Sequence, residues 1–331
     1  MLRREIGATG ITCSAIGLGT WAIGGAMWGG SDDAASRAAI AASIDAGTDL
    51  IDTAPGYGLG HAESLIGEVI RGRRDRVVIA TKCGLNWHHA RGTPFFEQYG
   101  KQVYRYLGTE GVAHEVEESL RRLATDYIDI YITHWPDSTT PIDETLEALN
   151  RLKRDGKIRA IGASNLQPDD LDRYLALGGL DCIQERFSMI DRGIEAEILP
   201  SIKGRAVSTI SYSPLGMGLL TGKITPDREF PGDDIRKDDP RFSINIRMAV
   251  ANFAHDLRDL TTDRGVTLSQ LIVAWTLQQP QIDFVLCGAR KAGHASENAQ
   301  AGRIALGAND LARIDAAADR HLRRHFQAAS G

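Results

Sequence analysis

Short apolar runs recur along the whole chain, and more polar, helix-like segments separate them. Most of the runs are rich in isoleucine and valine and apolar nearly throughout, as strands covered on both faces are. We predict strands at eight runs: Ala15–Thr20, Leu50–Ala54, Val77–Lys82, Ile128–Trp135, Ile158–Asn165, Cys182–Ser188, Ser208–Leu215 and Asp283–Ala289.

The segments between these runs predict helices. In Gly111–Ala124, valine and leucine recur on one face at helical spacing. The next helix has a start signal, with Thr140 as N-cap and Pro141 as its first residue. Eight strand–helix units without a linker predict a (β/α)8 TIM barrel that forms a single domain over residues 1–331. The opening segment, Leu2–Thr12, predicts a hairpin before the barrel.

A Rossmann domain is the competing architecture. The stretch Gly17–Ala22 fits G-x-G-x-x-A after a strand, as a dinucleotide-binding turn does. Such a turn must open a helix, but the following IGGAMWGG is too rich in glycine to start one. We expect the next helix only near Ser31, so the pattern favours the barrel.

Composition and charge narrow the class of protein. Hydrophobic residues make up 43% of the 331 residues, enough for a sizeable core. The net charge of −5 gives no electrostatic case for nucleic acid or an acidic membrane as partner. The four cysteines form no C-x-x-C pair and are typical of reduced cytoplasmic thiols. No apolar run indicates a secretion signal or membrane span, so we expect a cytoplasmic protein, and its oligomeric state stays open.

Four polar residues fall at or near the ends of three consecutive predicted strands. Residues of equal parity in a strand share a face, so Asp52, Lys82 and His134 are expected to point into the barrel mouth, where barrel enzymes keep their chemistry. Tyr57 lies on the loop after the second strand and can fold over the same mouth. Singly, each residue fits an ion pair or simple packing. Together they favour a catalytic site, because an unpaired buried charge destabilises the folded protein by several kcal/mol.

These motifs resemble those of the aldo-keto reductase family, in its bacterial branch. The resemblance runs through DTAPGYG, ATK and THW, and continues in GASN, YSPLGMGLLTGK and GARKAGHASEN. It implies a nicotinamide cofactor held by residues from several segments. They are Ser164, Asn165 and Gln184 for the carboxamide, Tyr212 for stacking, Ser213, Leu215, Gly216 and Lys223 for the pyrophosphate, and Gly288, Arg290, Glu297 and Asn298 for the adenosine end.

The same resemblance implies a division of labour in the site. Tyr57 acts as general acid toward a carbonyl oxygen, and Lys82 as a cation is expected to lower the pKa of Tyr57. Asp52 keeps Lys82 charged and aimed, and His134 orients the substrate oxygen.

The cofactor type is predicted from the adenosine segment. Arg290 and Lys291 offer cations for a 2′-phosphate, which favours NADP(H) and leaves NAD(H) possible. Two positions depart from the family pattern, since Phe187 stands where tyrosine is frequent and His294 where arginine or glutamine is.

Aromatic residues are expected around the substrate. Trp21, Trp28, Trp87 and Trp135 fall on loops or strand ends at the predicted mouth, and such walls suit sugars and aryl ketones alike. Two long loops, residues 83–108 and 216–242, are expected to shape the pocket. No metal site is expected, because His88 and His89 have no Asp, Glu or Cys nearby at ligand spacing. The stretch His321–Phe326 either reaches the rim or ends the last helix.

The leading functional prediction is NADPH-dependent reduction of aldehydes or ketones to alcohols. One alternative runs the same chemistry in the oxidative direction, as an NAD(P)-dependent sugar or polyol dehydrogenase. An alternative of another class is a non-catalytic NADP-binding regulatory subunit. The expected partner in the enzymatic cases is a small carbonyl compound or sugar.

Overall fold

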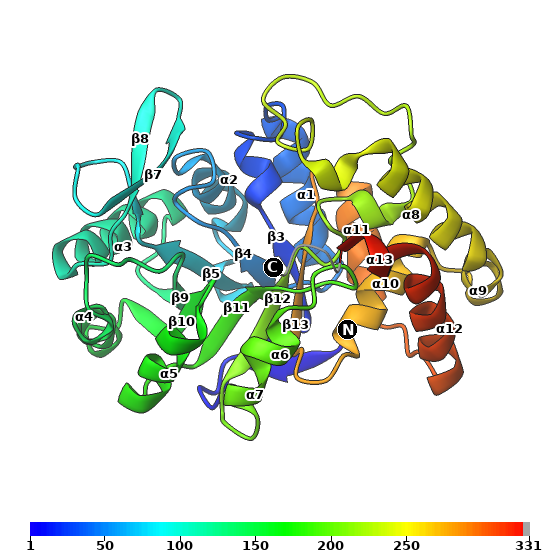
Figure 1. The fold of residues 1–331 in the computed structure, drawn as a ribbon. Helices are drawn as coiled ribbons and strands as arrows, with labels where there is room; N and C mark the ends of the chain where they lie inside the picture. The colour runs from blue at the N-terminus through cyan, green and yellow to red at the C-terminus, as the bar shows by residue number, and fades with distance from the viewer. Residues whose placement is uncertain (327–331) are drawn as a thin grey trace.

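Eight parallel strands form a closed barrel at the centre of the computed structural model, which describes residues 1–326 (Figure 1). The strands follow one another around the barrel in chain order, and the last pairs with the first. Each lies at a run where the sequence predicts a strand, so the predicted (β/α)8 barrel is confirmed. The barrel strands are β3 (Ile16–Gly19), β4 (Leu50–Asp52), β5 (Val78–Cys83), β9 (Ile128–Thr133), β10 (Ile158–Ser164), β11 (Cys182–Arg186), β12 (Ser208–Tyr212) and β13 (Phe284–Gly288).

Alternate strand residues fill the barrel interior, as the period of two requires. Leu50, Ala80 and Ile130 belong to one buried cluster inside it. The predicted opening hairpin is present as β1 (Arg3–Glu5) and β2 (Thr12–Ser14), and its apolar side chains join the same cluster. The hairpin therefore covers the end of the barrel at which the strands begin, and leaves the other end for the polar residues.

Helices surround the barrel and pack on the outer faces of the strands, where a second and larger apolar cluster lies. The predicted helix at 111–124 is observed with slightly different bounds. The helices are α1 (Asp33–Asp45), α2 (His61–Ile70), α3 (Thr109–Leu123), α4 (Ile142–Arg154), α5 (Pro168–Leu177), α6 (Ile194–Glu197), α7 (Leu199–Ile202), α8 (Ile244–Asp256), α9 (Arg258–Arg264), α10 (Leu268–Leu277), α11 (Ala292–Ala301), α12 (Ala308–Ala318) and α13 (Arg324–Phe326).

The start of α4 differs from the sequence prediction. Pro141, with φ −62° and ψ 141°, is the N-cap, and the helix begins at Ile142. The hydroxyl of Thr140 donates to Oδ2 of Asp137 at 2.7 Å instead of capping the helix. The prediction of Thr140 as N-cap is therefore wrong, because a nearby carboxylate takes its hydroxyl.

The long loop predicted at 83–108 contains a small antiparallel sheet. Its strands are β6 (Leu85–Asn86), β7 (Thr93–Gln98) and β8 (Lys101–Arg105). The hairpin between β7 and β8 turns through Tyr99 and Gly100, with φ of 51° and 71°, a left-handed pair typical of tight hairpins. Figure 1 shows this hairpin standing out above α2 and α3.

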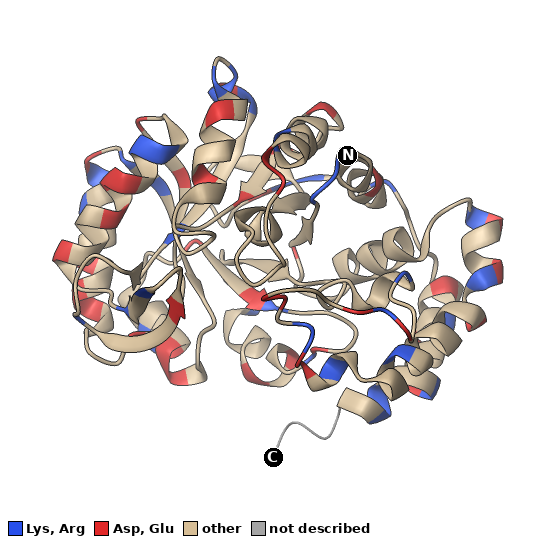
Figure 2. Ribbon diagram, turned by 90° about the horizontal axis from the view of Figure 1, so that it is seen from above, with Lys and Arg blue, Asp and Glu red and all other residues tan. Residues whose placement is uncertain are grey.

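Charged residues lie mainly on the outer helices, with both signs interspersed (Figure 2). Within residues 1–326, no helix is long and apolar enough to cross a bilayer. The stretch His321–Phe326 continues the end of α12, and His321 Nε2 lies 2.9 Å from Oδ2 of Asp256 in α8. It therefore packs against the outer helices.

Candidate active site

The four polar residues predicted from strand parity and from the loop after the second strand come together at one end of the barrel. Their strands β4, β5 and β9 are neighbours, because β5 pairs with both of the others. Lys82 Nζ donates to Oδ1 of Asp52 at 2.8 Å, to the carbonyl of Thr53 at 2.9 Å and to the hydroxyl oxygen of Tyr57 at 3.2 Å. The ring of His134 stands edge-on to Tyr57, with the ring centroids 5.8 Å apart.

A tight turn after β4 places Tyr57. The turn packs directly on the short helical segment Trp21–Gly24. A Cβ atom at Gly24 would lie 2.5 Å from the carbonyl carbon of Tyr57, and one at Gly58 would lie 2.3 Å from the carbonyl oxygen of Gly24. Glycine at both positions therefore allows the close contact that fixes the tyrosine over the barrel mouth.

Burial controls the proton affinities of these groups. It lowers the pKa of Lys82, and the charge of Asp52 and its hydrogen bond to the lysine act in the opposite direction. Burial, with a smaller contribution from the Asp52 carboxylate, raises the pKa of Tyr57 well above its usual value. Burial, followed by the charge of Lys82, lowers the pKa of His134 well below its usual value. At neutral pH, Tyr57 is therefore protonated and His134 is neutral.

The expected effect of Lys82 on Tyr57 is contradicted. The sequence predicts a lowered pKa for Tyr57, but burial and the nearby Asp52 carboxylate raise it. Lys82 and Asp52 are both almost completely buried and 2.8 Å apart, so they present a paired charge to the phenol. The structure places Tyr57 as a group that holds its proton firmly.

Two of the three residues predicted for the carboxamide, Asn165 and Gln184, are hydrogen-bonded directly to these four residues, and Ser164 is bonded to both of them. Gln184 Nε2 donates to Oδ1 of Asp52 at 2.7 Å. Asn165 Nδ2 donates to the carbonyl of His134 at 2.8 Å, and Asn165 Oδ1 accepts from the hydroxyl of Tyr212 at 2.6 Å. One hydrogen-bonded network therefore contains both predicted groups of residues.

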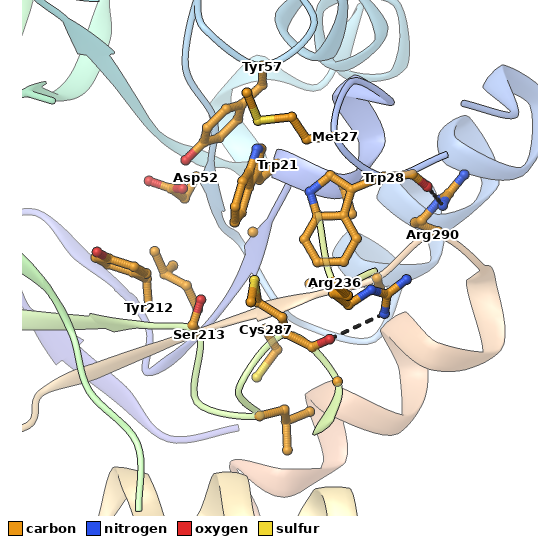
Figure 3. Close-up of a pocket in the computed structure, with 18 of the residues that line it drawn as sticks. Trp21, Met27, Trp28, Asp52, Tyr57, Tyr212, Ser213, Arg236, Cys287 and Arg290 are labelled. Atoms are coloured by element: carbon orange, nitrogen blue, oxygen red, sulfur yellow. Dashed lines mark hydrogen bonds between the residues drawn. The ribbon is translucent and has the colours of Figure 1, made fainter. Parts of the chain in front are cut away.

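A cavity of about 1040 Å³ opens over this network (Figure 3). Most of the residues singled out in the sequence line it. They are Asp52, Tyr57, His134, Ser164, Asn165, Gln184, Tyr212, Ser213, Leu215, Lys223, Gly288, Arg290, Glu297, Asn298, Trp21, Trp28 and Trp135.

Three of the predicted residues do not line this cavity as residues 1–326 form it: Lys82, Gly216 and Trp87. Lys82 lies behind Asp52 and Tyr57, which it contacts. Gly216 takes φ of 55° and donates its N–H to the carbonyl of Ser213, so it shapes the turn after β12. The ring of Trp87 packs on His88, with centroids 4.9 Å apart, so the wall is built by the other three tryptophans.

Arg290 makes a contact that the sequence does not predict. Its Nη1 donates to the carbonyl of Trp28 at 2.9 Å, and its Nη2 donates to the carbonyl of Gly30 at 2.5 Å. Figure 3 shows Arg290 reaching Trp28 at the edge of the pocket. The guanidinium thus fastens the loop between β3 and α1, whereas Lys291 beside it is exposed.

The loop after β12 fastens the same segment from the other side. The carboxylate of Asp233 accepts from the backbone N–H of Met27 at 2.9 Å and of Gly29 at 3.0 Å. The guanidinium of Arg236 lies over the ring of Trp28 at 4.9 Å. The two loops therefore form a continuous strap along the cavity.

Part of the cavity wall comes from residues that sequence reasoning missed. Phe95, Phe96 and Gln98 of β7 line it, and the ring of Phe95 contacts Trp135 with centroids 5.3 Å apart. The run of alternating residues around Tyr99-Gly100 is a hairpin signal that could have found them. Glu185, Asp233 and Arg236 carry no comparable signal, because their partners are distant in sequence or are backbone groups.

Comparisons with known proteins agree with this geometry. The sequence model described as the Aldo/keto reductase family matches residues 15–319. The NADH-specific methylglyoxal reductase of Escherichia coli is 40% identical over 314 residues, covering 92% of this chain and 95% of that protein.

Solved structures are similar over almost the whole chain. A glycerol dehydrogenase of Gluconobacter oxydans has a TM-score of 0.86 and 36% identity, covering 97% of this chain and 96% of that one. An aldo/keto reductase of Klebsiella pneumoniae, in complex with NADP and acetate, has a TM-score of 0.71 and 30% identity, covering 92% and 91% of the two chains.

Proposed function

This chain belongs to the aldo/keto reductase family, and we propose from that premise that it reduces aldehydes or ketones to alcohols with NADP(H), using Tyr57 as general acid. The observation that carries the proposal is the position of Lys82. Its ammonium group contacts Asp52 and the hydroxyl of Tyr57 at once, beside a cavity that His134 also lines. A phenol held this way can deliver a proton at a fixed point.

The cavity suits a nicotinamide cofactor together with a small substrate. Its volume of about 1040 Å³ is at the upper end of the roughly 300–1,000 Å³ of usual ligand pockets. Amide and hydroxyl groups of Ser164, Asn165 and Gln184 line one part of it, and the cations Arg290 and Lys291 line another. These groups suit a carboxamide and a phosphate respectively.

The protein's own residues would divide the work as follows. NAD(P)H, when bound, supplies the hydride. Tyr57, protonated at neutral pH because its pKa is raised, gives its proton to the substrate oxygen as that oxygen gains charge. His134, a neutral imidazole, orients the oxygen, and the Lys82–Asp52 pair fixes the phenol and offsets the charge left on it. Aromatic side chains keep water away from this point.

Family membership and the complete quartet favour an enzyme over the non-catalytic binding subunit. The oxidative alternative is favoured by one observation, the likeness to a glycerol dehydrogenase. Use of NAD(H) is supported by the NADH-specific name of the Escherichia coli relative, and use of NADP(H) by the NADP complex of the Klebsiella protein. Both cofactors and both directions therefore belong in the test.

The test begins with activity. We expect the purified chain to consume NADPH with para-nitrobenzaldehyde and methylglyoxal, and to act more slowly with aldoses or, in reverse, with glycerol. NADH should be assayed in parallel with each carbonyl compound. Absence of turnover with every substrate, in a protein that still binds NADPH, would contradict the proposal.

The role of Tyr57 is tested by Tyr57→Phe. Loss of the acid should lower kcat by about a hundredfold or more, the low end of what acid–base catalysis contributes, while the Kd of NADPH stays within about twofold. Tyr131→Phe is the control, because Tyr131 is fully buried and does not line the cavity in the described residues. A Tyr57→Phe variant with more than about a hundredth of normal turnover would remove Tyr57 from this role.

A further inference from the structure

Asn165 occupies a junction in the site. Its side-chain amide donates to the carbonyl of His134 at 2.8 Å and to Oγ of Ser164 at 3.1 Å. Its Oδ1 accepts from the hydroxyl of Tyr212 at 2.6 Å. The orientation of this one amide therefore sets the relation between the proton-donating side of the cavity and the side proposed to hold the nicotinamide.

The backbone of Asn165 is in an unusual conformation. Its φ is 57°, in the left-handed region, which costs most residues roughly 1–2 kcal/mol and which asparagine tolerates better than most. Asn165 follows directly on β10, and the helix α5 starts shortly after it. Something outside the turn must hold this conformation if the amide is to keep its three hydrogen bonds.

Glu185 is placed to do this. It follows Gln184 on the neighbouring strand β11, and by strand parity its side chain points away from the barrel interior. Only 5% of Glu185 is exposed, and its Oε1 accepts from the backbone N–H of Leu166 at 2.9 Å. The backbone N–H of Asn165 donates to the carbonyl of Gln184 at 3.4 Å, and it also acts to lower the pKa of the neighbouring Glu185 carboxyl. Glu185 therefore binds the N–H that directly follows Asn165 and stands beside the N–H of Asn165 itself.

The surroundings of Glu185 make a purely stabilising role a poor account of it. Within residues 1–326, no lysine or arginine forms an ion pair with it, and its side-chain hydrogen bond is the one from the N–H of Leu166. Burial raises its pKa to about 8, although the N–H groups of Leu166 and Asn165 act to lower it. A buried carboxyl group without a cation is costly to keep.

We propose that Glu185 is a positioning residue that holds Asn165 in its left-handed conformation and so builds the nicotinamide end of the cofactor site. The inference rests on the proposed function, because it assigns a consequence to the cofactor that this function requires. Glu185 touches neither substrate nor cofactor and acts through the amide of Asn165. Its loss should weaken recognition of the nicotinamide half of the cofactor and leave the adenosine half unaffected.

The experiment compares two ligands on three proteins. NADPH and adenosine 2′,5′-bisphosphate, which lacks the nicotinamide half, are titrated against the full chain by calorimetry. The proteins are the unaltered chain, Glu185→Gln and Glu115→Gln. Glu185→Gln keeps one acceptor oxygen but replaces the other by an NH2 group, which cannot accept from the N–H of Leu166 or of Asn165. Glu115 on α3 is a matched control: it is 3% exposed, its pKa is also raised to about 8, and it accepts from the backbone N–H of Gly84 at 2.6 Å.

We expect Glu185→Gln to raise the Kd of NADPH about tenfold, the size of one hydrogen bond between neutral groups, with the Kd of the bisphosphate within twofold. Glu115→Gln should change neither Kd by more than twofold. Glu185→Leu, which removes both acceptors, should give a larger selective loss; should it not fold, Glu185→Gln decides alone.

Equal weakening of both ligands by Glu185→Gln, or no weakening of NADPH, would overturn the role of Glu185. These outcomes leave the proposed function standing, because the unaltered chain still binds NADPH. Failure of the unaltered chain to bind either NADPH or NADH would instead overturn the proposed function, and the inference with it.

Discussion

At the scale of single residues, one oxygen atom connects the two halves of the site. Oδ1 of Asp52 accepts from Lys82 Nζ at 2.8 Å and from Gln184 Nε2 at 2.7 Å. The ammonium group in turn contacts the hydroxyl of Tyr57. The proposed carboxamide site depends on Gln184. A shift of Gln184 would therefore move Asp52 and, through Lys82, the hydroxyl of Tyr57.

The structure predicts a role for Arg290 in holding the cavity wall, whereas the sequence predicts a contact with a 2′-phosphate. Its guanidinium holds the carbonyls of Trp28 and Gly30, and Trp28 packs edge-on against Trp21 at 5.2 Å. Arg290→Met should loosen this wall and raise the KM of the carbonyl substrate about threefold to tenfold, whichever cofactor is used, since two charge-assisted hydrogen bonds are lost. Steady-state kinetics with NADPH and with NADH measure this.

Lys291→Met is the matched control for Arg290→Met. Lys291 is an exposed cation on the same cavity wall, so its removal should raise the KM of NADPH, leave that of NADH unchanged, and leave the KM of the substrate unchanged. If Arg290→Met instead weakened only NADPH, the guanidinium would have to leave the loop to bind the 2′-phosphate. The interpretation from sequence alone would then be the correct one.

The polar residues at the strand ends could be predicted from the sequence, whereas the hydrogen-bond partners of Arg290 and Glu185 could not. Parity placed Asp52, Lys82 and His134 in one mouth because side chains alternate strictly along a strand. Arg290 and Trp28 are 262 positions apart, and the partners of Glu185 are backbone N–H groups, which have no sequence signature. The direction of the Tyr57 pKa shift was missed because the extent of burial depends on the whole packed site.

At the scale of elements, the β7–β8 hairpin carries the part of the cavity wall least visible in the sequence. The apolar–polar alternation of its strands is short, with a register irregularity between Pro94 and Phe96. Proline and a bulge both weaken the pattern by which strands are recognised. The barrel strands are buried over most of their length, and their apolar runs were long enough to predict.

Phe95 tests the contribution of this hairpin to substrate choice. Its ring is 39% exposed, contacts Trp135 and lies under the guanidinium of Arg105 at 5.0 Å. Phe95→Ala should raise the KM for para-nitrobenzaldehyde by about threefold to tenfold, because one aromatic contact is worth roughly 0.5–1.5 kcal/mol. The KM for methylglyoxal, which has no ring, should stay within twofold, as should kcat for both.

Tyr99→Ala is the control for the hairpin. Tyr99 is 66% exposed at the tip of the hairpin and does not line the cavity in the described residues. Tyr99→Ala should therefore leave the KM of both substrates unchanged. An equal rise in KM for both substrates in Phe95→Ala would mean that the hairpin acts through overall loop position. It would then carry no selectivity for aromatic carbonyl compounds.

At the scale of the whole molecule, the periodic apolar residues of the strands determine the barrel, and the polar residues at the ends of those strands form the site. Several strands fill the barrel below the mouth with apolar side chains and carry a polar one at or just after their end, as Ile130 and Ile132 of β9 and the following His134 show. Closing the barrel brings those ends together without any further signal. No comparable sequence pattern predicts the strap formed by residues 21–30 and 213–243. These irregular segments are held together by individual contacts, such as those of Asp233.

The same packing leaves carboxyl groups buried without a cation, and this predicts how stability depends on pH. Burial raises the pKa of Glu115 from 4.5 to about 8. The folded state therefore holds this proton more tightly than the unfolded state, so the stabilisation is complete below about pH 4.5 and is lost as pH rises to about 8. Each such group contributes a slope of about 1.4 kcal/mol per pH unit in that window.

Glu115→Gln removes this slope and should gain stability relative to the unaltered chain as pH rises from 5 to 8, measured by urea unfolding at pH 5, 6.5 and 8. Glu118→Gln on the same helix is the control, because the hydrogen bond from Arg121 lowers the pKa of Glu118. The stability that Glu118 contributes is already complete above about pH 4.5, so its difference from the unaltered chain should be constant over this range. Parallel pH curves for Glu115→Gln and the unaltered chain would show instead that Glu115 is ionised in the folded protein at pH 5, with α3 adjusting to solvate it.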